Sequence, residues 1–93
     1  MATSSADARL RATIRADRRR IAAGIRPLYH ATWTTAPDGP PIVDLMIREL
    51  PIIHLFVPDR AGVPDGARLL VSRTLAVDPT SFDVVVVDPP SPG

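Results

Sequence analysis

The chain has 93 residues, of which 45% are hydrophobic and 23% charged, and its formal net charge is +1. A chain of this length and composition predicts a single globular domain over residues 1–93, with one modest core. The absence of Cys excludes disulfides, thiolate nucleophiles and Cys-ligated zinc. No apolar run approaches the ~20 residues that a membrane-spanning helix needs, so we expect no membrane contact. The expected location is the cytoplasm, or a virus particle into which the chain is assembled.

Charge is distributed unevenly along the chain. Residues 1–26 contain seven Arg and two Asp, a net charge of +5, whereas residues 27–93 contain four Arg and eight acidic residues, a net charge of −4. All eleven basic residues are Arg, and Lys, Asn and Gln are absent, which is typical of a high-GC source genome. The lack of Lys also excludes Schiff-base lysine chemistry and the lysine of a phosphate-binding P-loop.

The N-terminal part of the chain predicts a leader over residues 1–5 and an amphipathic helix over residues 6–25. Alanines at many positions favour the helix, and Gly24 predicts its end. The apolar residues that share one stripe of this helix are Leu10, Ile14, Ile21 and Ile25.

Asp17 lies inside this apolar stripe, where an unpaired carboxylate would be costly. One interpretation is that the stripe is only half buried and that Asp17 pairs with a nearby Arg at its rim. The other interpretation is a contact with a partner subunit. We favour the first, because carboxylates are rarely buried without a partner.

Three segments after the helix are expected to be strands. Residues 28–35 are rich in aromatic residues and Thr, and residues 52–57 form a short apolar run. Residues 42–50 are ambiguous, because they alternate as a strand does but would also form a helix that is apolar nearly all round. We favour the strand, followed by a bend or bulge at Pro51. Residues 36–41 are predicted to be a turn.

Residues 66–87 are predicted to form a β-hairpin. Its first arm, residues 68–77, alternates imperfectly between apolar and polar side chains, and residues 78–81 have turn chemistry. The return arm, residues 82–87, contains four consecutive valines, so we expect it in the centre of the sheet or covered on both faces. Residues 59–66 are expected to be the longest loop.

These segments together predict an α+β domain. One N-terminal amphipathic helix is followed over residues 28–87 by a small, mostly antiparallel sheet of four or five short strands, barrel-like or sandwich-like. A Pro-rich tail covers residues 88–93. The expected core is Leu10, Ile14, Ile21, Ile25, Val43, Leu45, Ile47, Ile53, Leu55, Leu69, Val71, Phe82, Val84 and Val86.

No catalytic, cofactor-binding or metal site is predicted. His30 and His54 lie in expected strands without a third ligand at metal-binding spacing, so we interpret them as structural. The sequence has no Gly-rich phosphate loop and no serine in a nucleophile elbow. We therefore expect the chain not to be an enzyme and to need no cofactor.

The Arg-rich helix is the one segment with a functional interpretation. Its charges can follow a phosphate backbone, pack on the acidic remainder of a neighbouring copy, or face solvent. The candidate interaction surface comprises Arg11, Arg15, Asp17, Arg18, Arg19, Arg20 and Arg26. Tyr29 and Trp33 share one strand face, which suits base stacking, but packing in the core is the favoured explanation.

These observations favour a non-enzymatic structural or interaction subunit of a homo-oligomeric assembly, whose partners are copies of itself or other protein subunits. By analogy of class, a connector, tail or capsid accessory component of a phage particle has this character. The alternative is a small DNA-binding regulator or antitoxin that uses the Arg-rich helix. Nucleic acid is the less favoured partner, because the net charge is close to zero.

Overall fold

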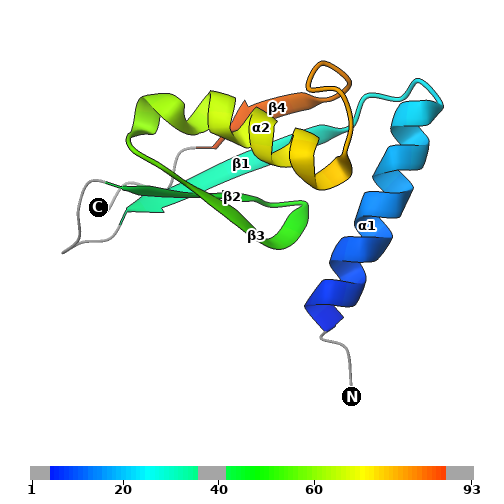
Figure 1. The fold of residues 1–93 in the computed structure, drawn as a ribbon, viewed down its shortest axis with the longest axis horizontal. Helices are drawn as coiled ribbons and strands as arrows, with labels where there is room; N and C mark the ends of the chain where they lie inside the picture. The colour runs from blue at the N-terminus through cyan, green and yellow to red at the C-terminus, as the bar shows by residue number, and fades with distance from the viewer. Residues whose placement is uncertain (1–4, 36–41, 88–93) are drawn as a thin grey trace.

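The computed structural model describes residues 5–35 and 42–87 and shows an α+β fold in which two helices pack with a mixed, four-stranded sheet (Figure 1). In chain order the elements are α1 (Ser5–Ala22), β1 (Leu28–Thr35), β2 (Val43–Ile47), β3 (Leu50–Val57), the 3-10 turn η1 (Arg60–Gly62), α2 (Val63–Leu75) and β4 (Asp83–Val86).

The sheet is open and has the strand order β3-β2-β1-β4. β1, β2 and β3 form an antiparallel meander, whereas β4 lies parallel to β1. β3 and β4 therefore run in the same direction, and α2 crosses over the sheet between them. The predicted barrel or sandwich is wrong, because the sheet is open. The sheet has four strands and two of its three pairings are antiparallel, as expected, but β4 is parallel to β1 because a helical crossover replaces the expected hairpin.

The first arm of the predicted hairpin is the helix α2, which interrupts the sheet expected over residues 28–87. Its buried apolar residues recur every four positions, and this helical period outweighs the imperfect alternation. Pro64 and Asp65 in the first turn suit a helix start, so the expected loop over residues 59–66 contains η1 and the beginning of α2. The buried apolar residues of α2 are Val63, Ala67, Val71 and Leu75.

β4 confirms a strand within residues 82–87, but it lies at the edge of the sheet and not at its centre. Val84 and Val86 pack against the core, whereas Val85 on the opposite face is 42% exposed. Four consecutive valines therefore do not require cover on both faces in this position.

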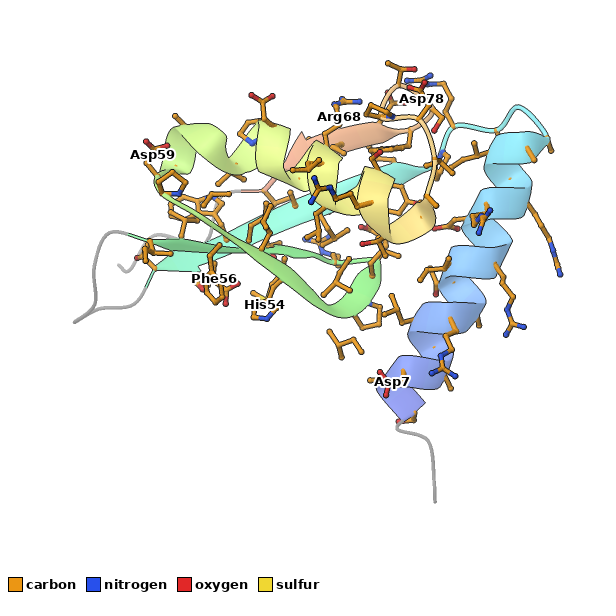
Figure 2. All side chains as sticks on the ribbon, in the orientation of Figure 1. Asp7, His54, Phe56, Asp59, Arg68 and Asp78 are labelled. Carbon is orange, nitrogen blue, oxygen red and sulfur yellow. The ribbon has the colours of Figure 1, made fainter. Side chains whose placement is uncertain are left out.

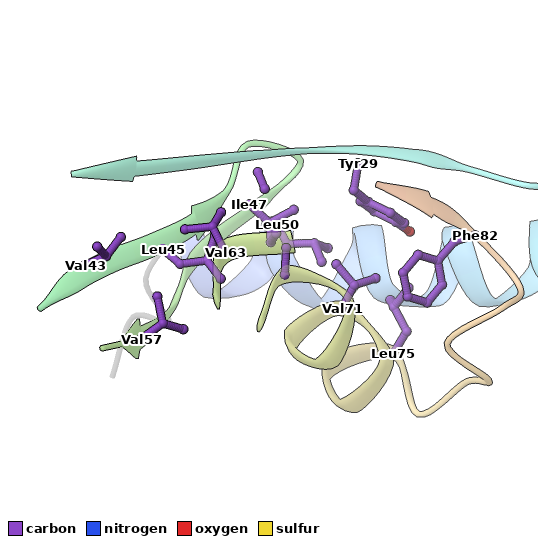
Figure 3. Packing of buried hydrophobic residues seen from close by; sticks show 12 residues of the cluster. Tyr29, Val43, Leu45, Ile47, Leu50, Val57, Val63, Val71, Leu75 and Phe82 are labelled. Atoms are coloured by element: carbon purple, nitrogen blue, oxygen red, sulfur yellow. The ribbon is translucent and has the colours of Figure 1, made fainter. Parts of the chain in front are cut away.

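The main core lies between α2 and one face of the sheet (Figure 3). Gly66 brings α2 close to the sheet, since a Cβ built there would lie 2.9 Å from Val57 Cγ1 and 3.2 Å from Leu45 Cδ2. Of the predicted core, Leu69 is exposed because it lies on the outer side of α2. The buried residues that the prediction omitted are Tyr29, Ala31, Leu50, Val57, Val63, Ala67 and Leu75.

The remaining elements follow the sequence more closely. α1 ends at Ala22, and the turn after it places Gly24 at a φ of 85°, so Ile25 leaves the apolar stripe and is 54% exposed. The strand interpretation of residues 42–50 is confirmed for β2, after which the chain turns into β3. The bulge expected at Pro51 is confirmed by a register shift opposite β2. The predicted turn at residues 36–41 and the tail lie outside the described residues, as does most of the leader.

Candidate interaction surfaces

One face of the sheet is covered by α2, and no helix in the described part of the chain covers the other. The side chains of Thr32, Met46 and His54 lie side by side across three strands of this uncovered face. Its large apolar residues are well exposed, with Phe56 at 61% and Leu28 at 50%. We call this surface the bare face, and its residues are Leu28, His30, Thr32, Thr34, Asp44, Met46, His54, Phe56, Asp83 and Val85.

The two histidines of the bare face each contact a carboxylate. His30 Nδ1 lies 2.5 Å from Glu49 Oε2, and the His30 backbone N–H donates to Glu49 Oε1 at 2.7 Å. His54 Nδ1 lies 3.0 Å from Asp44 Oδ1, and its ring meets Phe56 edge to face. Figure 2 shows His54 and Phe56 on the side of β3 that faces away from α2. Both histidines thus belong to fixed polar pairs, which separate the apolar groups on this face.

The bulge in β3 forces one residue into an unfavourable backbone conformation. Ile52 has a φ of 66°, which is a genuine outlier for a β-branched residue, and its side chain is 57% exposed. Such strain persists only where the surrounding structure imposes it, and it concentrates at functional positions. A shallow concavity of about 380 Å³ opens beside it, lined in part by Thr32, Met46, Arg48, Pro51 and His54.

The predicted interaction surface divides into two groups. Arg11, Arg15, Arg18 and Arg19 are exposed on α1 and form no ion pair within the described residues. The other three residues, Asp17, Arg20 and Arg26, have contacts within the fold and are not a free surface.

Asp17 is buried, with 5% of its surface exposed, and accepts a hydrogen bond of 2.6 Å from the Tyr29 hydroxyl. Arg20 donates to its second oxygen at 3.3 Å. The expected pairing with an Arg is therefore confirmed, but the carboxylate lies deeper than the rim. Burial and the bond to Asp17 raise the pKa of the Tyr29 phenol above its ordinary value. Tyr29 and Trp33 pack against the core, as favoured over base stacking.

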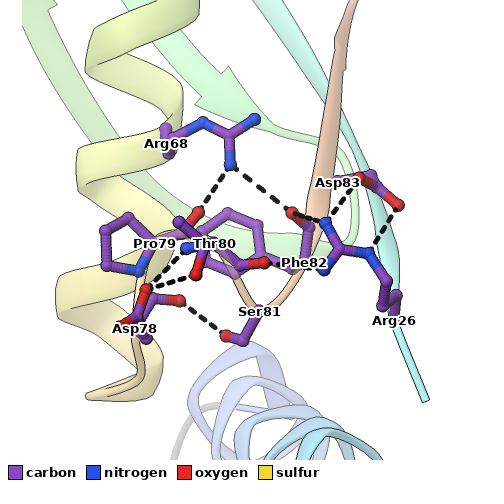
Figure 4. A network of polar contacts seen from close by, with 8 residues as sticks. All are labelled: Arg26, Arg68, Asp78, Pro79, Thr80, Ser81, Phe82 and Asp83. Carbon is purple, nitrogen blue, oxygen red and sulfur yellow. Dashed lines mark hydrogen bonds and ion pairs between the residues drawn. The ribbon is translucent and has the colours of Figure 1, made fainter. Parts of the chain in front are cut away.

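Arg26 and Arg68 hold the segment that leads into β4 (Figure 4). Arg26 donates to the Thr80 carbonyl at 2.7 Å and to Asp83 Oδ1 at 2.9 Å. Arg68 donates to the Pro79 carbonyl at 2.5 Å and lies 5.7 Å from the centre of the Phe82 ring. The Arg26 guanidinium keeps the pKa of Asp83 below its ordinary value.

This arrangement is not predictable from local sequence, because the pattern of residues 68–77 predicts a strand for the segment that contains Arg68. The alternation of Leu28, His30 and Thr32 with buried residues could have revealed the bare face, but only once the position of α2 was known.

Among the described residues, no three His, Asp or Glu side chains come together at a spacing that could hold a metal ion. The described helices include none with the length and apolar character to cross a bilayer. Comparisons with protein-family models, curated proteins and solved structures found no match to this chain.

Proposed function

We propose that this chain is a non-enzymatic interaction subunit that works in a homo-oligomeric assembly, with the bare face as a contact surface between copies. The observation that carries the proposal is the exposure of large apolar side chains on one whole face of the sheet. Phe56 and Leu28 lie near opposite ends of this face, and Met46 and Val85 add further apolar area. Polar pairs separate these groups, but exposed large apolar side chains on a sheet face that no described helix covers favour an interaction site.

Charge supports copies of the same chain as the partners. The exposed arginines of α1 are positively charged, whereas residues 27–93 carry a net charge of −4, with Asp59, Asp65 and Asp78 exposed. Opposite charges on one molecule steer two copies toward each other and fix their orientation. The attraction weakens with salt, because both sets of charges are solvent-exposed.

The experiment compares two substitutions of exposed apolar residues by Asp. Phe56→Asp places a charge on the bare face, and Leu69→Asp is the matched control on the outer side of α2, where the side chain is 45% exposed. Phe56→Asp is expected to weaken self-association by about tenfold or more, because large aromatic residues contribute strongly at interfaces. Equal self-association of the two variants, measured by sedimentation equilibrium, would contradict the proposal.

A finer form of the proposal is an accessory component of a phage particle, such as a connector, tail or capsid protein. Its support is the analogy with small, Pro-rich, non-enzymatic subunits of such assemblies. The protein would then be found in the virus particle as well as in the cytoplasm where it is made. Detection of the chain in purified particles by mass spectrometry is the expected result, and its absence from them would contradict this form.

The second candidate is DNA binding through α1, favoured by exposed arginines that have no ion-pair partner in the described part of the chain. In this case, replacing Arg15, Arg18 and Arg19 with Glu would abolish both DNA affinity and its dependence on salt. If the wild-type chain shows no salt-dependent binding to duplex DNA, this candidate is excluded.

A further inference from the structure

The two edges of the sheet differ in how well they are protected against pairing with another strand. An unprotected edge presents N–H and C=O groups that can accept a further strand. β3 is interrupted by Pro51 and by the strained bulge at Ile52, and α1 packs beside it. β4 has neither a Pro nor a bulge between Asp83 and Val87.

Backbone groups of β4 alternate between bonding to β1 and pointing away from the sheet. The N–H groups of Asp83 and Val87 donate to carbonyls of Pro27 and Ala31, at 2.9 and 2.8 Å. The alternation of a strand places Val85 in the same inward-bonding set. Val84 and Val86 therefore direct their backbone groups outward, where the described part of the chain provides no strand to pair with them.

We propose that β4 pairs antiparallel with β4 of a second copy across a two-fold axis at Val85, which joins the two sheets into one of eight strands. The inference rests on the proposed function, since it specifies how copies of the chain associate. In this register Val84 of each copy forms a hydrogen-bonded pair with Val86 of the other copy, so the two-fold axis relates two such pairs.

The side chains agree with this register. Asp83 lies opposite Val87 of the second copy, so that no like charges face each other across the pair. A register centred on Val84 would instead require the Phe82 carbonyl, which already accepts hydrogen bonds from Arg26 and Arg68. Within the described part of this edge, the two arginines thus leave only Val84 and Val86 available for pairing.

Pairing through β4 also enlarges the bare face. Four strands about 4.8 Å apart and about 20 Å long give a projected area of ~400 Å², which two joined copies double to ~800 Å². This is about the area that one partner contributes to a standard protein interface. The dimer would therefore present a contact surface of sufficient size for further assembly.

The test introduces a single thiol, because the native chain contains no Cys. On the two-fold axis, Val85 and its symmetry mate form a non-hydrogen-bonded pair with Cα atoms about 4.5 Å apart, which a disulfide can bridge. Val85→Cys is expected to form a covalent dimer under mild oxidation, on a non-reducing gel, at least tenfold faster than Leu69→Cys. Leu69 is the matched control, with 45% exposure against 42% for Val85. Equal rates of cross-linking would overturn the proposal.

A second variant tests the edge without a thiol. Val86→Pro removes an outward N–H that bonds to no group in the described part of the chain, so the fold should persist while pairing is blocked. In the Phe56→Asp background, where contact through the bare face is weakened, Val86→Pro is expected to give a native circular dichroism spectrum and to reduce the mass of the dimer to that of the monomer. A dimer that persists in this double variant would overturn the proposal. A wild-type chain that is monomeric at every concentration contradicts both this inference and the proposed function. If the wild-type chain is multimeric but the Val85→Cys variant does not cross-link, only the proposed pairing through β4 is contradicted.

Discussion

At the scale of single residues, polar contacts attach the peripheral elements to the sheet. Asp17 joins α1 to β1 through the buried Tyr29 hydroxyl. Removing Asp17 leaves that hydroxyl without its partner, and removing the hydroxyl leaves the carboxylate with Arg20 alone. A buried polar group without a partner costs about 1–3 kcal/mol, so this bond contributes strongly to the position of α1 relative to β1.

Alkaline pH should reveal the environment of Tyr29. The pKa of Tyr29 is raised in the native state, so the unfolded chain loses its phenolic proton at a lower pH than the native chain does. The contribution of Tyr29 to stability is therefore complete below the ordinary pKa near 10 and decreases as pH rises above that value. Tyr29 is the single tyrosine, so tyrosinate absorbance reports this group alone. We expect tyrosinate to appear only together with the loss of helical circular dichroism, whereas the urea-unfolded chain titrates near pH 10. A native spectrum with a fully ionised tyrosine would contradict the assignment.

Acid should weaken the contact between Arg26 and Asp83. The pKa of Asp83 is lowered in the native state, so its contribution to stability is present above the ordinary value near 3.9 and is lost as pH falls through the lower, native value. Both side chains are exposed, so salt should reduce the effect. Asp83→Asn should therefore make unfolding less dependent on pH below about 4. An unchanged acid dependence in thermal melts, for this variant and for Arg26→Ala, would show that the contact is not formed.

At the scale of elements, the close approach of α2 to the sheet determines how the core packs. Gly66→Ala adds a methyl group 2.9 Å from Val57 Cγ1, and overpacking of this kind costs about 1–3 kcal/mol. The higher helix propensity of Ala stabilises α2 by about 1 kcal/mol, so we expect the free energy of unfolding, measured with urea, to fall by about 1 kcal/mol in total.

Val57→Ala provides the control for this change. Removing the Val57 methyl groups relieves the contact, so the double variant should lose less stability than the two single losses added together. A stabilised Gly66→Ala variant would show that α2 can move away from the sheet at no cost.

The elements differ in how far the sequence predicted them. α1 and the strands β1, β2 and β3 follow from local periodicity and from prolines, and all were predicted. α2 was not predicted, because its sequence is compatible with the alternation of a strand as well as with a four-residue helical period. The helix is selected by packing against a sheet surface whose strands come from distant segments of the chain. The position of β4 at the edge of the sheet depends on the same crossover, so it could not be predicted from the sequence of residues 82–87 alone.

The candidate surfaces also divide into features that local sequence predicts and features that depend on the tertiary structure. The exposed arginines of α1 follow from composition and helical phase alone. The bare face required knowledge of which side α2 covers, and the role of Arg26 required its contacts with residues 80–83, more than fifty positions away in the chain.

At the scale of the whole molecule, the fold is layered on one side only. α2 and the core lie on one face of the sheet and α1 packs beside β3, whereas the bare face with its exposed apolar side chains lies on the other face. The outer edge of β4, with which no described strand pairs, and the basic helix α1 are further candidate surfaces for contact between copies. This asymmetry underlies the proposal that the chain functions within an assembly.

The most direct measurement is the solution mass of the untagged chain by size exclusion with light scattering, over a range of concentrations at low and high salt. The account predicts a mass of at least twice the 10.0 kDa of one chain, with assemblies larger than the dimer dissociating first as salt rises. A mass of 10.0 kDa at every concentration and salt would contradict it.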